Sequence, residues 1–181
     1  MILGCVLAGG QSSRFGSDKA LAELGGETLI ARAVDTLAGW CELVVVVGRE
    51  QAPAPTLPDW PRPGMGPLGG IAAAIHHARQ EQFDSVLTCG VDAPWLPEDL
   101  PALLSPAPAY LADQPVIGLW PASASPVIDA ILEGEGRHSM RQFAESIGAR
   151  AVKLSAIPAN INTPADLAAA TSRIGEKPDG L

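Results

Sequence analysis

The chain is poor in basic residues and has no long apolar run. Lysine and arginine together number 12 against 20 aspartates and glutamates, which gives a net charge of −8. This balance argues against a nucleic-acid surface, which needs a basic patch to contact polymer phosphates, but not against a local basic pocket for one nucleotide. No apolar run approaches the roughly 18 residues of a membrane-spanning helix, so we expect no contact with a membrane.

Paired cysteines and a signal peptide are also missing. Cys5, Cys41 and Cys89 are far apart and form no C-x-x-C motif. Cys5 and Cys89 fall in strand-like runs, which favours buried free thiols over redox or metal-binding cysteines. Met1 precedes a short apolar run and a polar loop rather than a leader peptide. These features predict a cytoplasmic protein, because a reducing compartment keeps thiols free.

The length and composition predict one globular domain. The chain has 181 residues, of which 47% are hydrophobic, and a single domain of this size can bury a substantial core. We expect the folded domain to cover residues 1–172. The polar residues 173–181 are expected to form a flexible tail.

Short apolar runs alternate with helix-like stretches along the chain. Strands are predicted at residues 2–7, 43–47, 85–89 and 117–120, with a weaker one at 150–154. Helices are predicted at residues 28–37 and 68–79 and from Ser125, Thr163 and Pro97 onward. This order predicts an α/β fold, a single-domain, doubly wound (Rossmann-like), mostly parallel sheet with helices on both faces. Ligands of such sheets bind at the carboxyl ends of the strands.

The first strand leads into a glycine-rich loop, and residues 7–19 read LAGGQSSRFGSDK. Gly9 and Gly10 let the backbone approach phosphate oxygens and present N–H groups to them. Arg14 and Lys19 can neutralise the remaining charge of a triphosphate. The loop fits neither G-x-x-x-x-G-K-[ST] nor G-x-G-x-x-G. A glycine pair alone would equally suit a tight turn between a strand and a helix.

The loop resembles the signature L-A-G-G-x-S-x-R-M-G-x-D-K of the molybdenum cofactor guanylyltransferase family. Phe15 replaces the usual Met, and every other fixed position is present. The resemblance extends from about Ile2 to Ala170 and implies the nucleotide-diphospho-sugar transferase type of fold. It implies catalytic roles for Arg14 and Lys19. It also implies nucleotide binding by Leu7, Ala8, Gly9, Gly10 and Lys19.

A second string, GMGPLGG at residues 64–70, lies before an alanine-rich helix. A helix start offers free N–H donors, although a plain helix-entry turn would read the same way. The string resembles the G-P-L-A-G segment that lines the guanine pocket of the family, with Gly69 where Ala is usual. The implied nucleotide-binding residues are Gly66, Pro67 and Leu68, together with Asp59 seven positions before Gly66. Whether Asp59 binds the base or the ribose stays open, as does a solvated loop position.

Asp92 follows a buried strand, at the edge where such sheets bind ligands. In a triphosphate pocket, a carboxylate there indicates a Mg²⁺ ligand, because Mg²⁺ prefers one or two carboxylates plus phosphate oxygens and water. The family carries an Asp-x-Pro here for that purpose, which also implies contact between Asp92 and the nucleotide. The alternative is a turn or capping role. His76 and His77 are neighbours on a predicted helix and face different directions, so they do not indicate a metal site.

Asn160 and Asn162 belong to a segment, NINTPADL, that matches the N-x-N-T-P-x-D-L pattern of the family. The resemblance places both amides on the acceptor side of the site, and alternate residues of an extended segment point the same way. Asn162 could instead belong to the cap of the following helix. The chain departs from the family at Gly48, where Asn is frequent, and one contact to the nucleotide is therefore in doubt.

Taken together, the resemblance implies Mg²⁺-dependent transfer of GMP from GTP to molybdopterin, with release of pyrophosphate. A cytidylyltransferase for the same cofactor, or a transferase for another small acceptor, is the alternative within the class. A non-catalytic nucleotide-binding regulator is the alternative outside it. A transient contact with proteins that handle the molybdenum cofactor is a further expectation, since a labile product is suited to direct transfer.

Overall fold

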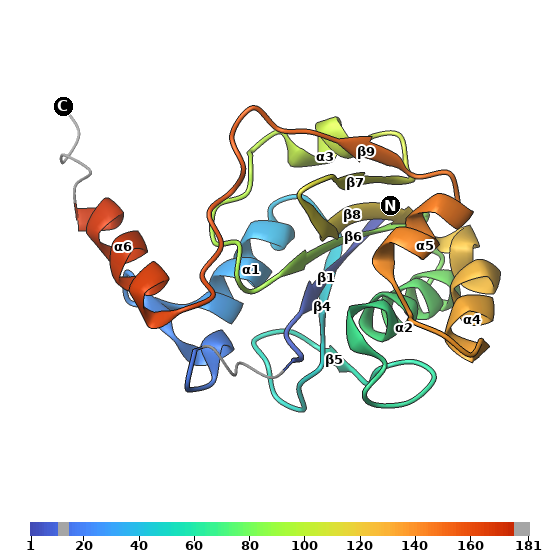
Figure 1. Cartoon of the computed structure of the whole chain (residues 1–181), viewed down its shortest axis with the longest axis horizontal. Helices are drawn as coiled ribbons and strands as arrows, with labels where there is room; N and C mark the ends of the chain where they lie inside the picture. Colours follow the sequence, from blue (N-terminus) through green and yellow to red (C-terminus); the bar gives the residue numbers. More distant parts are fainter. Residues whose placement is uncertain (11–14, 176–181) are drawn as a thin grey trace.

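A seven-stranded sheet forms the centre of the molecule (Figure 1). The computed structural model describes residues 1–10 and 15–175. Across the sheet, the strands are ordered β5 (Thr56–Leu57), β4 (Leu43–Val47), β1 (Ile2–Leu7), β6 (Ser85–Gly90), β8 (Gln114–Pro121), β7 (Ala109–Leu111) and β9 (Arg150–Val152). The predicted strands are all present, and the Val-rich β4 and the fully buried β6 lie inside the sheet.

The sheet is mostly parallel, as predicted. β1 pairs in parallel with β4 and β6, and the pairs β4–β5 and β7–β9 are also parallel. β8 runs antiparallel to both of its neighbours, β6 and β7. The sequence did not indicate this reversal or β7, because β7 has three residues in a proline-rich stretch and connects to β8 through a tight turn.

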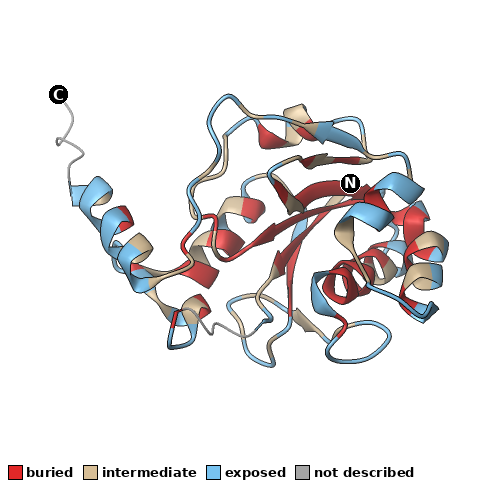
Figure 2. Ribbon diagram, in the orientation of Figure 1, coloured by how far each residue is buried: buried red, intermediate tan, exposed pale blue. Residues whose placement is uncertain are grey.

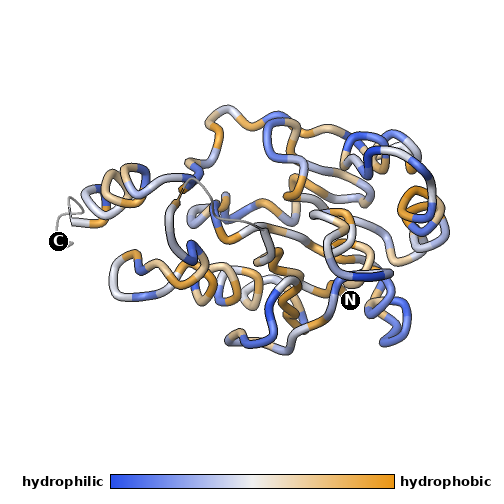
Figure 3. The backbone as a smooth tube through the Cα atoms, turned by 60° about the horizontal axis from the view of Figure 1, so that its bottom comes forward, coloured by the Kyte–Doolittle hydropathy of each residue, from blue (hydrophilic) through white to orange (hydrophobic). Residues whose placement is uncertain are grey.

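Helices cover both faces of the sheet. α1 (Leu29–Ala38) and α3 (Leu100–Leu104) lie on one face, and α2 (Gly66–Gln80), α4 (Ser125–Glu133) and α5 (Met140–Ser146) lie on the other. Figure 2 shows the buried residues concentrated in the sheet and on the sides of the helices that face it. In Figure 3, the more hydrophilic segments lie at the periphery. A doubly wound domain is confirmed.

α1 shows how the local sequence sets an element. Thr28 is its N-cap, and its Oγ1 accepts a hydrogen bond from the N–H of Ala31 at 3.3 Å. The predicted apolar face is buried against the sheet and consists of Leu29, Ile30, Ala33 and Leu37. The capping hydroxyl of Thr28 and the helical spacing of the apolar residues therefore both favour a helix at this place in the chain.

One predicted helix start was wrong, because the helix expected from Pro97 begins at Leu100, in α3. Arg173, where the tail was expected to start, lies in α6 (Pro164–Gly175), which contacts a small hairpin made of β2 (Glu23–Leu24) and β3 (Glu27–Thr28). The remaining tail residues, 176–181, lie outside the described part of the chain.

The cysteines are free thiols, and Cys5 and Cys89 are buried as predicted. Burial raises the pKa of Cys89 and of the half-buried Cys41 to about 12, and raises the pKa of Cys5 further. Trp120 is fully buried in the core, where its indole N–H donates to Thr88. Among the described residues, no helix has both the length and the apolar character needed to cross a membrane.

Candidate active site

The candidate site lies where three parallel strands end together. Leu7, the last residue of β1, is in register with Val47 of β4 and with Gly90 of β6. Parallel strands end at the same edge of a sheet, so the segments that follow β1, β4 and β6 emerge side by side. Gly9 of the glycine-rich loop, Gly48 and Asp92 are brought together in this way, although they are far apart in sequence.

A cleft of 520 Å³ opens at this edge, which is within the usual size range of small-molecule sites. It contains most of the predicted nucleotide-binding residues, namely Leu7, Gly9, Gly10, Lys19, Asp59, Gly66, Pro67 and Asp92. Ala8 lines an adjoining hollow, which shares Gly9, Gly10 and Lys19 with the cleft. Leu68 is fully buried in the core, so its side chain does not line the cleft.

Lys19 and Asp92 face each other within the cleft. Lys19 begins a short 3-10 helix, η1 (Lys19–Leu21), and its Nζ lies 4.0 Å from Oδ2 of Asp92. The side chains are 18% and 29% exposed, so each remains accessible to a ligand. A cation and an anion at this distance can separate to bind phosphate and metal. Arg14, the other predicted cation, lies outside the described residues.

Gly48 packs directly on Gly9 of the glycine-rich loop. A Cβ built on Gly48 would lie 2.4 Å from both the Cα and the N of Gly9, and the φ of Gly48 is +92°. Residues with a side chain rarely adopt this conformation, and no side chain fits between the two backbones. In this chain, the position where the family frequently has Asn is therefore used for backbone packing.

Arg49 forms an ion pair with Asp18, near the end of the glycine-rich loop. Its Nη1 and Nη2 donate to the two carboxylate oxygens of Asp18, at 2.8 and 2.7 Å. The hydrogen bonds from Arg49 lower the pKa of Asp18 below its ordinary value. No local sequence pattern indicates this pair, because Arg49 follows β4 and Asp18 lies beyond β1, and the two meet only because these strands are neighbours in the sheet.

The N-terminus of α2 forms another wall of the cleft. Gly66 and Pro67 lie in its first turn, and of these two only Gly66 carries a backbone N–H, which has no partner within the helix. The helix has 15 residues, so its dipole favours an anion at this end. Asp59, on the loop before α2, is half-buried and lines the same cleft.

The predicted acceptor segment lies against Asp92. The N–H of Ile161 donates to the carbonyl of Asp92 at 2.7 Å, and Ile161 is buried. Its neighbours, Asn160 and Asn162, are exposed and half-buried, as expected for an extended segment with one buried face. The cap of α6 uses Thr163 and Asp166, and it involves only the backbone N–H of Asn162. The amide side chain of Asn162 is not part of that cap.

The donor set suits Mg²⁺ better than a metal held by protein alone. Within residues 1–10 and 15–175, no group of three or more His, Cys, Asp or Glu side chains comes together. Asp92 instead offers one carboxylate in a cleft that Gly9, Gly10 and Lys19 also line. One carboxylate plus phosphate oxygens and water is a frequent ligand set for Mg²⁺.

The chain is similar to several known proteins along nearly its whole length. A molybdenum cofactor guanylyltransferase from Rhodobacter capsulatus is 38% identical over 187 residues, covering 96% of each chain. One from Acidiphilium cryptum is 36% identical over 180 residues, covering 91% of each. The crystal structure of molybdopterin-guanine dinucleotide biosynthesis protein A from Archaeoglobus fulgidus has the same fold. Its TM-score is 0.78 at 21% identity, and the match covers 96% of this chain and 99% of that one.

The family assignment follows from the extent of these matches. The family model described as "MobA-like NTP transferase domain" matches residues 4–152, a range that includes the glycine-rich loop, the start of α2 and Asp92. The relatives cover nearly the whole chain at more than one third identity. This protein therefore belongs to the family of MobA-like NTP transferases and is a nucleotidyltransferase.

Proposed function

We propose that this protein transfers GMP from GTP to the terminal phosphate of molybdopterin and releases pyrophosphate. The observation that carries the proposal is the placement of Lys19 opposite Asp92, in a cleft between the glycine-rich loop and the start of α2. The relatives named guanylyltransferases support guanine as the base and molybdopterin as the acceptor.

The reaction needs positioning and charge stabilisation more than proton transfer. The acceptor phosphate attacks the α-phosphorus of GTP, the new P–O bond forms, and the bond to the pyrophosphate leaving group breaks. A phosphate monoester is largely ionised near neutral pH, because its second pKa is about 6. No general base is therefore required. The ammonium of Lys19 would stabilise the charge that develops on the leaving pyrophosphate.

Asp92 would hold Mg²⁺ together with phosphate oxygens of the nucleotide. A bound Mg²⁺ supplies charge neutralisation that reduces the repulsion between an anionic acceptor and a triphosphate. Lys19, whose Nζ lies 4.0 Å from Asp92, would bind the phosphates of the nucleotide. The N–H groups of Gly9, Gly10 and the first turn of α2 would bind further phosphate oxygens.

The remaining site residues would select the two substrates. The carboxylate of Asp59 would accept hydrogen bonds either from the N1–H and N2–H₂ edge of guanine or from a ribose hydroxyl. Asn160 and Asn162, on the segment tied to Asp92, would bind the acceptor. The acceptor phosphate would then be held beside the metal ligand.

A pyrophosphate-release assay with each of the four ribonucleoside triphosphates, with and without molybdopterin, tests the proposal. We expect release with GTP, Mg²⁺ and molybdopterin, and a product with the mass of the guanine dinucleotide. Selective use of CTP would replace guanine by cytosine in the proposal. Binding of GTP without release of pyrophosphate under any of these conditions would contradict catalysis and favour a regulatory nucleotide-binding protein.

A further inference from the structure

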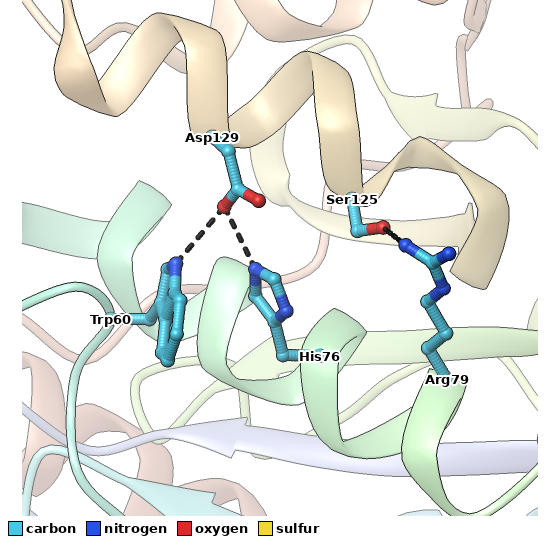
Figure 4. A network of polar contacts seen from close by, with 5 residues as sticks. All are labelled: Trp60, His76, Arg79, Ser125 and Asp129. Atoms are coloured by element: carbon cyan, nitrogen blue, oxygen red, sulfur yellow. Dashed lines mark hydrogen bonds and ion pairs between the residues drawn. The ribbon is translucent and has the colours of Figure 1, made fainter.

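Trp60 contacts two helices, α2 and α4 (Figure 4). It follows Asp59 on the loop between β5 and α2. Its backbone N–H donates to the carbonyl of Gly69 in α2 at 3.1 Å. Its indole Nε1 donates to Oδ1 of Asp129 in α4 at 3.0 Å. The residue is therefore held at its backbone and at the end of its side chain, by different helices.

His76 completes this arrangement. Its ring lies against the indole of Trp60, with ring centroids 4.2 Å apart. Its Nε2 lies 2.8 Å from the same Oδ1 of Asp129 that accepts from Trp60. An ionised carboxylate only accepts hydrogen bonds, so Nε2 of His76 carries the hydrogen and donates it. One carboxylate oxygen thus orients both rings, as Figure 4 shows.

The Trp60 side chain is 42% exposed, so burial alone does not fix its position. A half-exposed tryptophan would have rotational freedom if the two hydrogen bonds and the ring contact were absent. His76 and Asp129 are themselves 21% and 29% exposed, and both are carried by helices that pack on the sheet. The loop that carries Trp60 is therefore attached to helices that pack on the sheet.

Gly69 shows how closely this loop packs on α2. A Cβ on Gly69 would lie 3.1 Å from the carbonyl oxygen of Trp60 and 2.5 Å from the Cβ of Met65. The family segment usually has Ala at this position, and Gly69 replaces it here. The missing methyl group leaves space for the loop to lie against the helix.

We infer that Trp60, held by Asp129 and His76, is a positioning residue that fixes Asp59 for recognition of the nucleoside part of the substrate. The inference rests on the proposed function, because it assigns the way that same cleft selects its nucleotide. Asp59 and Trp60 are adjacent in the chain, so a displacement of the indole moves the carboxylate that lines the cleft. Trp60, His76 and Asp129 would not contact the reacting atoms.

Two variants test the inference. Trp60→Phe keeps a ring against His76 but removes the N–H donor, and Asp129→Leu removes the acceptor of both hydrogen bonds with little change in shape. Loss of one such hydrogen bond should raise KM for GTP about tenfold and leave kcat nearly unchanged. We expect both variants to fold, because Trp60 is on the surface and Asp129 is partly exposed.

The matched control is a second contact between the same helices. Nη1 of Arg79 in α2 donates to Oγ of Ser125 in α4 at 2.9 Å, away from the loop (Figure 4). Ser125→Ala weakens the packing of α2 on α4 without touching Trp60. We expect it to lower the melting temperature and leave KM for GTP unchanged. An equal rise in KM in Ser125→Ala would show that the effect comes from helix packing alone and would overturn the inference.

Nucleotide analogues give the second readout. ITP lacks the N2 amino group of guanine, and dGTP lacks the ribose 2′-hydroxyl. If Asp59 binds the base, Trp60→Phe should show a smaller preference for GTP over ITP than the wild type. If Asp59 binds the ribose, Trp60→Phe should show a smaller preference for GTP over dGTP than the wild type. Unchanged preferences against both analogues would overturn the inference. A wild-type protein that releases no pyrophosphate from GTP would instead contradict the proposed function, so the two failures are distinguishable.

Discussion

Gly9 and Gly48 are in backbone contact at the base of the cleft. A Cβ on Gly48 would lie 2.4 Å from the Cα and the N of Gly9, and the φ of Gly48 is +92°. We therefore expect Gly48→Ala to displace the glycine-rich loop at Gly9. The strained conformation costs roughly 1–3 kcal/mol, so urea unfolding should show a destabilisation of that order. Pyrophosphate release should fall at the same time, because the N–H groups of Gly9 and Gly10 lose their alignment.

Gly136→Ala is the matched control for this substitution. Gly136 has no other atom within 4 Å of an added Cβ, and its φ lies outside the left-handed region. Its replacement should leave both stability and turnover close to those of the wild type. A Gly48→Ala protein with wild-type turnover would contradict the assignment of the loop to phosphate binding.

Lys19→Ala should fold normally and lose nearly all turnover. The side chain lies in the cleft and is 18% exposed, so its removal leaves little unfilled space in the core. Loss of one fixed charge at a transition state costs on the order of 3 kcal/mol, or about a hundredfold in kcat. The measurement is pyrophosphate release at saturating GTP, with circular dichroism to confirm folding. Lys153→Ala, which removes an exposed lysine after β9, should behave as the wild type.

Local sequence patterns predicted the elements that build the site. β1 and β4 have continuous apolar runs, with Gly9 and Gly48 within two residues of their ends, so a parallel sheet with a ligand edge could be predicted. The family pattern then indicated Lys19 and Asp92. The structure places these two side chains 4.0 Å apart, although 73 positions separate them in the chain. Their proximity depends on β1 and β6 being neighbours, which the alternation of strands and helices alone does not specify.

Contacts between segments far apart in the chain could not be predicted from local sequence patterns. Trp60 and Asp129 are 69 positions apart, and Arg49 and Asp18 are 31 positions apart. Each pair depends on the packing of whole helices or on the order of strands, and no local pattern encodes either. The reversal of β8 has the same origin. Its direction is set by pairing with β6 and β7 rather than by its own residues.

Removal of the metal should stop the reaction, and Asp92→Asn should change its metal dependence. Asn offers a neutral oxygen in place of the carboxylate, so Mg²⁺ binding should weaken. We expect excess EDTA to abolish pyrophosphate release by the wild type. Asp92→Asn should need a much higher Mg²⁺ concentration for half-maximal turnover and reach a lower maximum.

Asp113→Asn is the control for the metal experiment. Asp113 is an exposed carboxylate on the turn between β7 and β8, and its loss removes the same formal charge from the protein. Its Mg²⁺ titration should overlay that of the wild type. A wild-type titration curve for Asp92→Asn would show that the metal is bound elsewhere.

The Asp18–Arg49 pair should make a pH-dependent contribution to stability. The hydrogen bonds from Arg49 lower the pKa of Asp18 in the folded protein. The contribution is therefore fully present above the unfolded-state pKa, about 3.9, and is lost as the pH falls through the lower folded-state value. The free energies of unfolding of wild type and Arg49→Gln, measured with urea, should differ at pH 7, and the difference should begin to shrink as the pH falls below about 4. Arg141→Gln breaks the exposed pair with Glu145 and should change little at either pH. A constant difference between wild type and Arg49→Gln across this range would contradict the ion pair, because packing alone does not titrate.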